Sequence, residues 1–227
     1  ALTTDHAHLA LGSDGARRYP AEIGPLSGIP EQSEASYRAL CPLAAPGGRV
    51  GLFLTEPPRM PAGWTLARGG ILDQMVSYEP QLFRGAIPDG AQTRRLTPAD
   101  APAMVALAEL TEPGPFRLRT IELGAFFGIL DSGRLLAMAG QRLRLPGFVE
   151  VSGVCTHPDA RGRGYARLLM SRVMEEILRE SRTPFLHTYA HNEAAIRIYR
   201  SLGFVRRRSL ELAVVQAETA GDDREFD

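Results

Sequence analysis

Residues 154–167 read VCTHPDARGRGYAR and connect a predicted strand to a predicted helix. Glycines at positions 162 and 164 let the backbone turn so that successive N–H groups point toward one spot. The start of the following helix adds unpaired N–H groups and the positive end of a dipole. Arg161 and Arg163 bring further positive charge. The segment therefore has the features of an anion cradle that fits a pyrophosphate.

Alone, this motif is a weak signal, because strand-to-helix turns often contain Gly and Arg for structural reasons. It is not a Walker loop, since no Lys-Ser/Thr pair follows the glycines. It also lacks the third glycine of the dinucleotide-binding fingerprint. Its meaning therefore depends on the elements that flank it.

The flanking sequence predicts an alternation of strands and helices. Leu169, Val173 and Ile177 recur on one side of the run after the cradle, which is amphipathic helix spacing. Thr97 and Pro98 indicate the start of an earlier helix. The expected strands are 92–96, 126–130, 135–145, 148–156, 185–190 and 204–215, and the expected helices are 98–110, 165–180 and one capped by Asn192 that ends at Leu202.

A second motif lies one helix and one strand later, where residues 191–204 read HNEAAIRIYRSLGF. Together the two motifs resemble the signature blocks of the Gcn5-related N-acetyltransferase (GNAT) superfamily, over residues 92–215. The run Cys-Thr-His-Pro-Asp before the cradle is similar to its FR47-like branch. The R/Q-x-x-G-x-G/A block is matched by Arg161, Gly164 and Ala166, and the N-x-x-A-x-x-x-Y-x-x-x-G-F block by Asn192, Ala195, Tyr199, Gly203 and Phe204.

The resemblance implies an α/β fold in which a mixed, mostly antiparallel sheet is flanked by helices. It also implies acetyl-coenzyme A as the cofactor and transfer of its acetyl group to a primary amine by direct attack. In the family, the strand before the cradle splays from its neighbour and offers backbone groups to the pantetheine arm. The cofactor-binding residues implied in this way are Val154, Cys155, Thr156, Arg161, Gly162, Arg163, Gly164, Tyr165, Ala166, Arg167, Asn192, Ala195 and Tyr199.

Tyr199 is the candidate general acid. Its spacing with Ala195, Ile198 and Leu202 alone favours an ordinary buried stripe of a helix. The resemblance implies instead that its phenol lies near the thioester sulfur and protonates the departing thiolate. The sequence leaves both interpretations open.

Glu150 is the candidate general base, because it lies on the strand before the cradle, eleven residues ahead of Arg161. The same offset separates base and cradle in histone acetyltransferases of the family. In a regular strand Glu150 points to the same face as Ser152 and Val154, whereas a bulge changes this parity. The alternatives are a solvated strand residue and a residue that only positions a substrate ammonium.

Composition argues against several classes of protein. The 227 residues include 26 Lys+Arg and 26 Asp+Glu, so no basic excess indicates a nucleic-acid partner. The run Arg206–Arg208 lies in a predicted strand, which favours an edge strand over a nucleic-acid patch. No apolar run approaches the roughly 18 residues of a membrane span, and no His, Cys and carboxylate set has metal-ligand spacing. We expect a cytoplasmic monomer or homodimer with no metal and no nucleic-acid or membrane partner.

The first ninety residues are rich in Pro and Gly and carry no recognisable chemical motif. Strands over 8–11, 49–54 and 72–78 and a helix over 31–40 predict a small α+β unit over 1–90. The resemblance raises the idea of a degenerate GNAT-like half. We expect this N-terminal unit to be followed by the acetyltransferase domain, 91–216, and a loose acidic tail, 217–227.

Three functions fit the sequence. The first is an amine acetyltransferase, the second a coenzyme A-binding sensor that has lost transfer, and the third a transferase for another acyl-coenzyme A. We expect the acceptor to bind the N-terminal unit and the loops between residues 111 and 125. A small amine, an amino acid, an aminoglycoside-like compound and a protein amine all remain open as acceptors.

Overall fold

A computed structural model describes residues 1–45, 47–87 and 90–218. Within these residues the strands form an eight-stranded sheet of order β4-β11-β5-β10-β9-β8-β7-β6 and a small sheet β1-β2-β3. The strands are β1 (Leu11–Ser13), β2 (Ala16–Arg18), β3 (Ser27–Gly28), β4 (Arg49–Leu54), β5 (Trp64–Val76), β6 (Ala91–Arg95), β7 (Phe126–Asp131), β8 (Arg134–Leu145), β9 (Phe148–Thr156), β10 (Thr183–Tyr189) and β11 (Val205–Ala217). The α-helices are α1 (Glu34–Leu40), α2 (Ala101–Thr111), α3 (Tyr165–Arg179) and α4 (Glu193–Ser201), and short 3-10 helices lie at Ala7–Leu9, Cys41–Leu43, Pro98–Asp100, Thr120–Leu123 and Pro158–Ala160.

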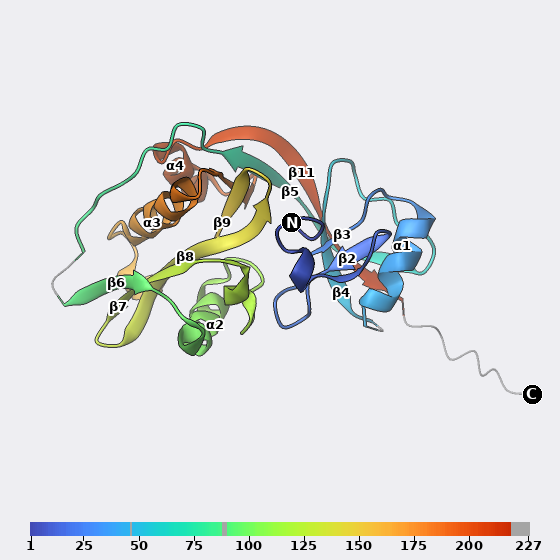
Figure 1. Ribbon diagram of the computed structural model, residues 1–227, viewed down its shortest axis with the longest axis horizontal. Helices are drawn as coiled ribbons and strands as arrows, with labels where there is room; N and C mark the ends of the chain where they lie inside the picture. Colours follow the sequence, from blue (N-terminus) through green and yellow to red (C-terminus); the bar gives the residue numbers. More distant parts are fainter. Residues whose placement is uncertain (46, 88–89, 219–227) are drawn as a thin grey trace, which may run out of the picture.

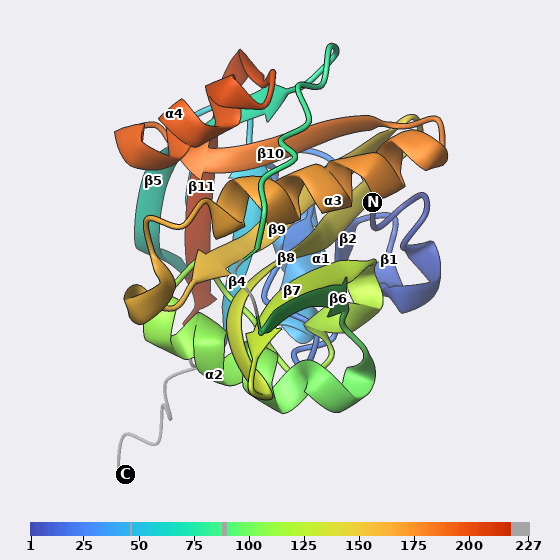
Figure 2. The same cartoon turned by 90° about the vertical axis from the view of Figure 1, so that its left-hand side faces the viewer.

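The large sheet is mixed and mostly antiparallel. Among the described strands, neighbours run antiparallel except β9 and β10, which run parallel. Helices α3 and α4 cover one face of the sheet and α2 covers the other (Figures 1 and 2). The predicted α/β class, with a mostly antiparallel sheet flanked by helices, is confirmed.

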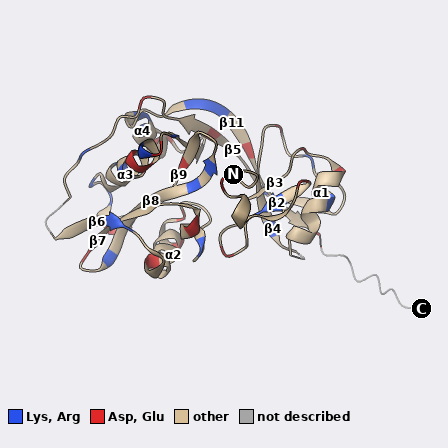
Figure 3. Cartoon of the chain, in the orientation of Figure 1, with Lys and Arg blue, Asp and Glu red and all other residues tan. Residues whose placement is uncertain are grey.

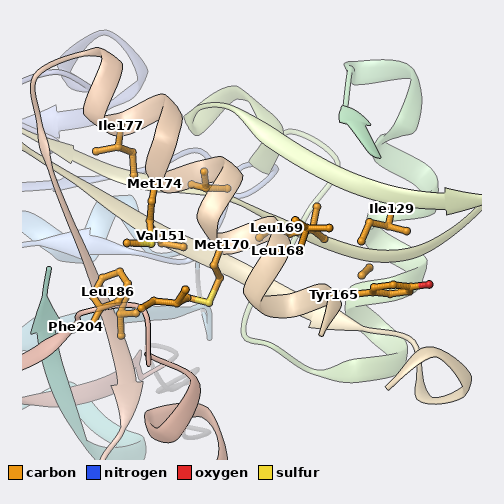
Figure 4. Close-up of a cluster of buried hydrophobic side chains, with 14 of the residues drawn as sticks. Ile129, Val151, Tyr165, Leu168, Leu169, Met170, Met174, Ile177, Leu186 and Phe204 are labelled. Carbon is orange, nitrogen blue, oxygen red and sulfur yellow. The ribbon is translucent and has the colours of Figure 1, made fainter. Parts of the chain in front are cut away.

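Helix α3 packs on the sheet through the apolar stripe that the sequence predicts. The stripe contacts β9, β10 and the residue before β11 (Figure 4). Burying each such side chain stabilises the fold by about 1.5–3 kcal/mol, so the cluster holds the first turn of α3 firmly on the sheet. The fully buried members on the helix are Leu169, Met170, Val173, Met174 and Ile177.

Helix α2 closes the opposite face with a smaller core. Met104 and Leu107 of the helix pack with Phe126 of β7 and Met138 of β8. The helix follows a capping box formed by Thr97 and Asp100, as the sequence indicated for Thr97. The two faces of the sheet are therefore covered by separate hydrophobic cores.

The long strands β5 and β11 bridge two lobes of the molecule (Figure 1). One lobe is built on β6 to β10 with α2, α3 and α4, and the other on β1 to β4 with α1. The end of β5 pairs with β10, where Leu72 lies opposite Tyr189. Its start, Trp64, lies in the core of the other lobe with Tyr37 and Val215. Within residues 1–90, β1 to β3 form the small sheet, whereas β4 and β5 belong to the large sheet, where β5 lies between β10 and β11.

Several predicted boundaries change for local reasons. The strand expected at 72–78 is only the end of β5, whose exposed middle and Gly69-Gly70 pair hide the strand pattern. A 3-10 helix occupies part of the expected strand 8–11. The expected tail 217–227 begins inside β11, and residues 219–227 lie outside the described residues. In the described part of the chain, no helix is long and apolar enough to cross a membrane.

Arg206–Arg208 lie where β11 has a strand on one side only. Strand β5 pairs with this part of β11, whereas β4 pairs with residues 211–216 (Figure 3). Arg206 donates to Asp73 at 2.6 Å and Arg207 to Gln74 at 2.7 Å. The arginine run is therefore at a local edge of the sheet, as expected, and two of its members are bound to β5.

Candidate active site

The parallel pair of β9 and β10 opens into a splay. Pairing is limited to Phe148, Val149 and Glu150 of β9 opposite residues 183–185. Beyond Glu150 the edge of β9 that faces β10 pairs with no strand in the described part of the chain. The splay implied by the family resemblance is therefore present, and β9 leads from it directly into the loop before α3.

This loop is shaped for an anion. Gly162 and Gly164 both have φ of +76°, in the left-handed region that favours glycine. A Cβ at Gly162 would meet no atom within 4 Å. Gly164 caps α3 without a side-chain hydrogen bond, so the N–H groups of the first turn keep their donor capacity. With Arg161 and Arg163 exposed alongside, these residues fit a pyrophosphate.

Helix α4, unlike α3, has a side-chain cap at its N-terminus. Asn192 caps it, because its Oδ1 accepts the Ala195 N–H at 3.2 Å. The predicted N-cap is therefore confirmed, and the chain itself satisfies this donor. The contact of Asn192 and Ala195 with the pantetheine arm stays a prediction.

Two side chains of the predicted cofactor set are engaged within the protein. Tyr165 is buried in the α3 core, so only its backbone is available to the cradle. The guanidinium of Arg167 lies over Phe83, with Cζ 4.2 Å from the ring centroid. The Phe83 N–H donates to Ser171 Oγ of α3 at 2.8 Å. The connector between β5 and β6 thus borders the cradle, which the sequence did not indicate.

A bulge in β9 decides which side chains face which side of the sheet. Ser152 lies opposite Gly140 and Cys155 opposite Met138, so β9 has one residue more than β8 in this interval. Gly153 accommodates the extra residue with φ of +60°.

The bulge changes the side-chain parity that a regular strand would have. Val151 packs into the α3 core, and Val154 packs against the same core. Glu150 instead bonds to Arg142, and Ser152 lines a cavity on the α2 side. Glu150 and Val154 therefore do not share the face that a regular strand would give them, because the extra residue shifts the alternation, as the sequence predicts for a bulge.

Tyr199 lies on the α3 side of the splay. It packs against the α3 core and meets the Phe204 ring edge-on, with ring centroids 6.3 Å apart. Burial raises the pKa of its phenol, and the neighbouring Thr188 of β10 opposes part of this rise. A phenol with a raised pKa keeps its proton at neutral pH, as a general acid requires.

Glu150 is completely buried, with 0% of its surface exposed. Arg142 donates to its carboxylate through Nε at 2.8 Å and Nη2 at 2.7 Å. The Leu143 N–H donates at 3.3 Å, and His187 Nδ1 lies 2.7 Å from Oε1. Burial by itself raises the pKa of Glu150, but Arg142 and His187 outweigh it and lower the pKa to about 2. This geometry does not support Glu150 as a base that contacts the amine.

Glu150 belongs to a polar ladder across five adjacent strands of the sheet. Arg207 of β11 donates to Gln74 Oε1 of β5, so the Gln74 amide nitrogen faces His187 Nε2 of β10 at 3.1 Å. This arrangement assigns the His187 proton to Nδ1, which donates to Glu150 of β9. Arg142 of β8 completes the ladder. The ladder spans the vertex where β9 and β10 separate.

A small cavity lies beside the bulge. Its wall contains Ser152 and Gly153 of β9, Arg142 of β8 and parts of the loop 113–120. Part of its wall lies in the region 111–125, which is expected from the sequence to bind the acceptor together with the N-terminal unit. The cavity lies on the face of the sheet opposite Tyr199, so the two sides of the splay have different linings.

The comparisons with known proteins agree with this geometry. A family model described as FR47-like protein matches residues 126–212. A solved structure of a putative acetyltransferase from the GNAT family of Novosphingobium aromaticivorans is 35% identical, covers 96% of this chain and 95% of its own, and superposes with a TM-score of 0.85. The chain belongs to the GNAT family.

More distant GNAT structures share the fold. A GCN5-related N-acetyltransferase from Kribbella flavida is 16% identical, with a TM-score of 0.60 and coverage of 96% of this chain and 92% of its own. A tandem GNAT protein from the clavulanic acid biosynthesis pathway is 15% identical, with a TM-score of 0.53 and coverage of 92% and 79%. No curated protein matches the sequence.

The structure also shows the surroundings of Cys155 and His157 in this GNAT protein. Burial raises the pKa of Cys155 to about 11, so its thiol stays protonated and is a poor nucleophile at neutral pH. His157 Nδ1 accepts the Asp159 N–H at 3.2 Å within the loop before the cradle. Among the described residues, no group of three or more His, Cys, Asp and Glu is arranged to hold a metal ion.

Proposed function

We propose that this GNAT protein transfers an acetyl group from acetyl-coenzyme A to a primary amine by direct attack. The observation that carries the proposal is a glycine-containing loop at the open end of the β9–β10 splay, where Gly162 has open space around it, the Phe83 ring borders Gly164 and the first turn of α3 has no side-chain cap. When bound, acetyl-coenzyme A supplies a thioester as the acetyl donor. The GNAT relative at 35% identity is itself described as a putative acetyltransferase, which supports the same reaction.

The cradle and the free strand edge provide two kinds of contact. Gly162, Gly164 and the first-turn N–H groups of α3 would bind the pyrophosphate, with arginines 161, 163 and 167 adding charge. The unpaired edge of β9, at residues 154–156, would bind the pantetheine arm through backbone hydrogen bonds. Asn192 and Ala195 would contact the same arm from α4.

Tyr199 would act as the general acid. Its protonated phenol lies on the side of the splay occupied by α3 and α4, whose first turns border the proposed coenzyme path. It would donate its proton to the departing sulfur, and solvent would restore the proton afterwards.

Glu150 would position other groups instead of taking the proton of the amine. Its carboxylate holds Arg142 and His187 at the vertex of the splay. The described wall of the cavity contains no carboxylate and no histidine, so we propose that water removes the proton of the acceptor amine. This replaces the base role that the sequence suggested for Glu150.

A coenzyme A-release assay with a panel of amines tests the proposal. We expect Tyr199→Phe to lower kcat by about 10- to 100-fold while the Kd for acetyl-coenzyme A holds, because general acid catalysis contributes rate and not affinity. Tyr37→Phe is the matched control, since the buried Tyr37 hydroxyl has no partner among the described residues. The chain contains no lysine, so acetylation of its own side-chain amines cannot release coenzyme A.

The outcomes separate the alternatives. Binding of acetyl-coenzyme A without turnover of any amine would favour a coenzyme A-binding sensor. Turnover with succinyl-coenzyme A but not acetyl-coenzyme A would favour another acyl donor. No binding of either by the wild type would exclude the proposed function.

A further inference from the structure

Arg142 is held rigidly with one nitrogen left over. Its Nε and Nη2 both donate to Glu150, which fixes the plane of the guanidinium. The Nη1 has no hydrogen-bond partner among the described residues. The side chain is 18% exposed, and the described cavity that it borders is the one beside the β9 bulge. The remaining donor nitrogen therefore has an outlet into that cavity.

The rest of the cavity wall offers few free polar groups. Most of the wall has no polar side chain, because it is formed by Phe116, Phe126 and the Pro-Gly-Pro segment 113–115. The Thr120 hydroxyl is already used, because it accepts the Arg117 N–H at 2.8 Å and donates to the Ile23 carbonyl at 2.7 Å.

Ser152 supplies the second free donor. Its hydroxyl has no hydrogen-bond partner within the described residues, and the residue borders the cavity directly next to Gly153 of the bulge. Arg142 and Ser152 come from neighbouring strands, since Gly140 lies opposite Ser152 in the β8–β9 ladder. A fixed cation and a hydroxyl at one cavity are complementary to an anionic oxygen.

The size of the cavity limits which anion fits. The cavity measures about 10 Å³, which is the volume that one water or one oxygen atom requires. A carboxylate can insert a single oxygen into such a space and keep the rest of its molecule outside.

We infer that Arg142 and Ser152 receive the carboxylate of the acceptor, so that the acceptor is an amine of the amino-acid type. The inference rests on the proposed function and names its substrate class. It places the carboxylate beside the bulge, and thus places the amine of the same molecule next to the free edge of β9.

The charge of the site disfavours polyamines and aminoglycosides. Such acceptors bind through carboxylates, and Glu150, the carboxylate paired with the cavity residue Arg142, is fully buried. Glu122 of the neighbouring 3-10 helix is paired with Arg119 at 2.6 Å. The charged group that reaches the cavity wall in the described residues is the cation of Arg142.

Matched acceptor pairs test the inference. We would measure kcat/KM for the twenty amino acids and for their carboxamides, together with phenethylamine and spermidine. The rates are compared per neutral amine, because the carboxylate raises the pKa of the amine beside it. We expect the reactive amino acids to exceed their carboxamides by at least tenfold, and spermidine to be poorer still.

Two variants tie the preference to the site. Ser152→Ala should raise KM for the amino acid at least fivefold and leave KM for the carboxamide unchanged. Arg142→Gln is combined with Glu150→Gln, so that no unpaired charge is left buried, and this double variant should lower the ratio of kcat/KM for the amino acid over its carboxamide at least fivefold. Arg144→Gln is the matched control, because Arg144 lies on the same strand, is 20% exposed and is likewise paired with a glutamate, Glu180. It does not border the cavity, so it should keep the preference intact.

The results that overturn the inference are distinct from those that overturn the proposed function. Equal rates for acids and carboxamides, better turnover of spermidine, or no turnover of any amino acid would each overturn it while coenzyme A still binds. A preference that survives both Ser152→Ala and the double variant Arg142→Gln/Glu150→Gln would also overturn it. Loss of coenzyme A binding by the wild type would instead remove the proposed function itself.

Discussion

The proposed coenzyme side of the splay, the loop 161–167, and its proposed acceptor side, the cavity beside the bulge with the polar ladder, are built from the chain in different ways. The cradle on the coenzyme side comes from one continuous stretch, residues 161–167, and acts mainly through backbone groups. The acceptor side gathers Arg142, Glu150 and His187 from three strands. Phe53 of the other lobe stacks on His187, with ring centroids 4.6 Å apart. A site made of backbone is encoded locally, whereas a site made of side chains depends on strand register.

The largest expected effect is on the acceptor side, at Glu150. Glu150→Ala leaves the guanidinium of Arg142 largely buried without its counter-charge, so the free energy of unfolding should fall by about 3–5 kcal/mol. Urea unfolding measures it. Glu180→Ala is the control, since the pair of Glu180 with Arg144 is more exposed and should contribute no more than about 1 kcal/mol. Equal losses in the two variants would contradict the distinction.

The next effect is on the coenzyme side. Gly162→Glu places a carboxylate in the cradle and should weaken coenzyme A binding by about 100-fold or more, through charge repulsion and blocked access. Calorimetry measures the Kd. Gly147→Glu is a closely matched control, because Gly147 also has φ of +76° and also has no atom within 4 Å of a Cβ. The backbone strain is then the same, and only Gly162→Glu should lose the ligand.

The third prediction concerns the pH dependence of stability and a buried histidine near the N-terminus. His6 is buried beside Tyr19, and its Nδ1 lies 2.8 Å from the Tyr19 hydroxyl. Burial, reinforced by the charge of Arg144, lowers the pKa of His6 from 6.5 to about 4. Above pH 6.5 neither the folded nor the unfolded state binds the proton, so stability is unaffected. As the pH falls from 6.5 to 4, the unfolded state takes up a proton that the folded state excludes, and stability is lost.

At pH 5 this loss should reach about 2 kcal/mol relative to pH 7.5. Unfolding in urea at the two pH values measures it. His6→Asn should reduce the difference by that amount, whereas His8→Asn should not, because His8 is exposed. An unchanged pH difference in His6→Asn would show that other groups control acid stability.

The smallest expected effect is at the connector. Phe83→Ala removes the ring beneath Arg167, and cation–π contacts of this kind contribute about 0.5–1 kcal/mol. KM for acetyl-coenzyme A should therefore rise about two- to fivefold, while a short acetyl thioester without the nucleotide should react as before. Leu82→Ala is the control, because Leu82 packs on the same α3 core but has no aromatic ring that could contact Arg167. Similar changes for both donors would assign Phe83 a purely structural role.

The same contrast explains how much the sequence predicted. The cradle, the α3 stripe and the Asn192 cap are local patterns, and the structure contains each of them. The mostly antiparallel sheet with helices on both faces also agrees with the family resemblance. These features depend on residues within a few positions of one another, so spacing alone carries them.

What the sequence missed depends on pairings between distant segments. A second register shift, between Gln141 and Arg144 of β8, sets Arg142 against Glu150, and no local pattern encodes that contact. The sequence contained one indication of the bulge, Gly153 itself, because a glycine inside a strand often marks a bulge. No sequence pattern indicated that β5 lies between β10 and β11, because these partner segments are far apart in the chain.

Strands β5 and β11, which the two lobes share, also determine the order in which the lobes can fold during synthesis. Val50 of β4 pairs with Val215, and Trp64 pairs with Ala217, so the first lobe completes its core with nearly the last described residues. During synthesis, β4 and α1 leave the ribosome long before β11 exists, and their apolar faces wait without a partner. Emergence of β11, and not emergence of the first half of the chain, therefore starts the closure of the first lobe. A nascent chain halted before β11 should accordingly be a strong client for chaperones that hold exposed strands.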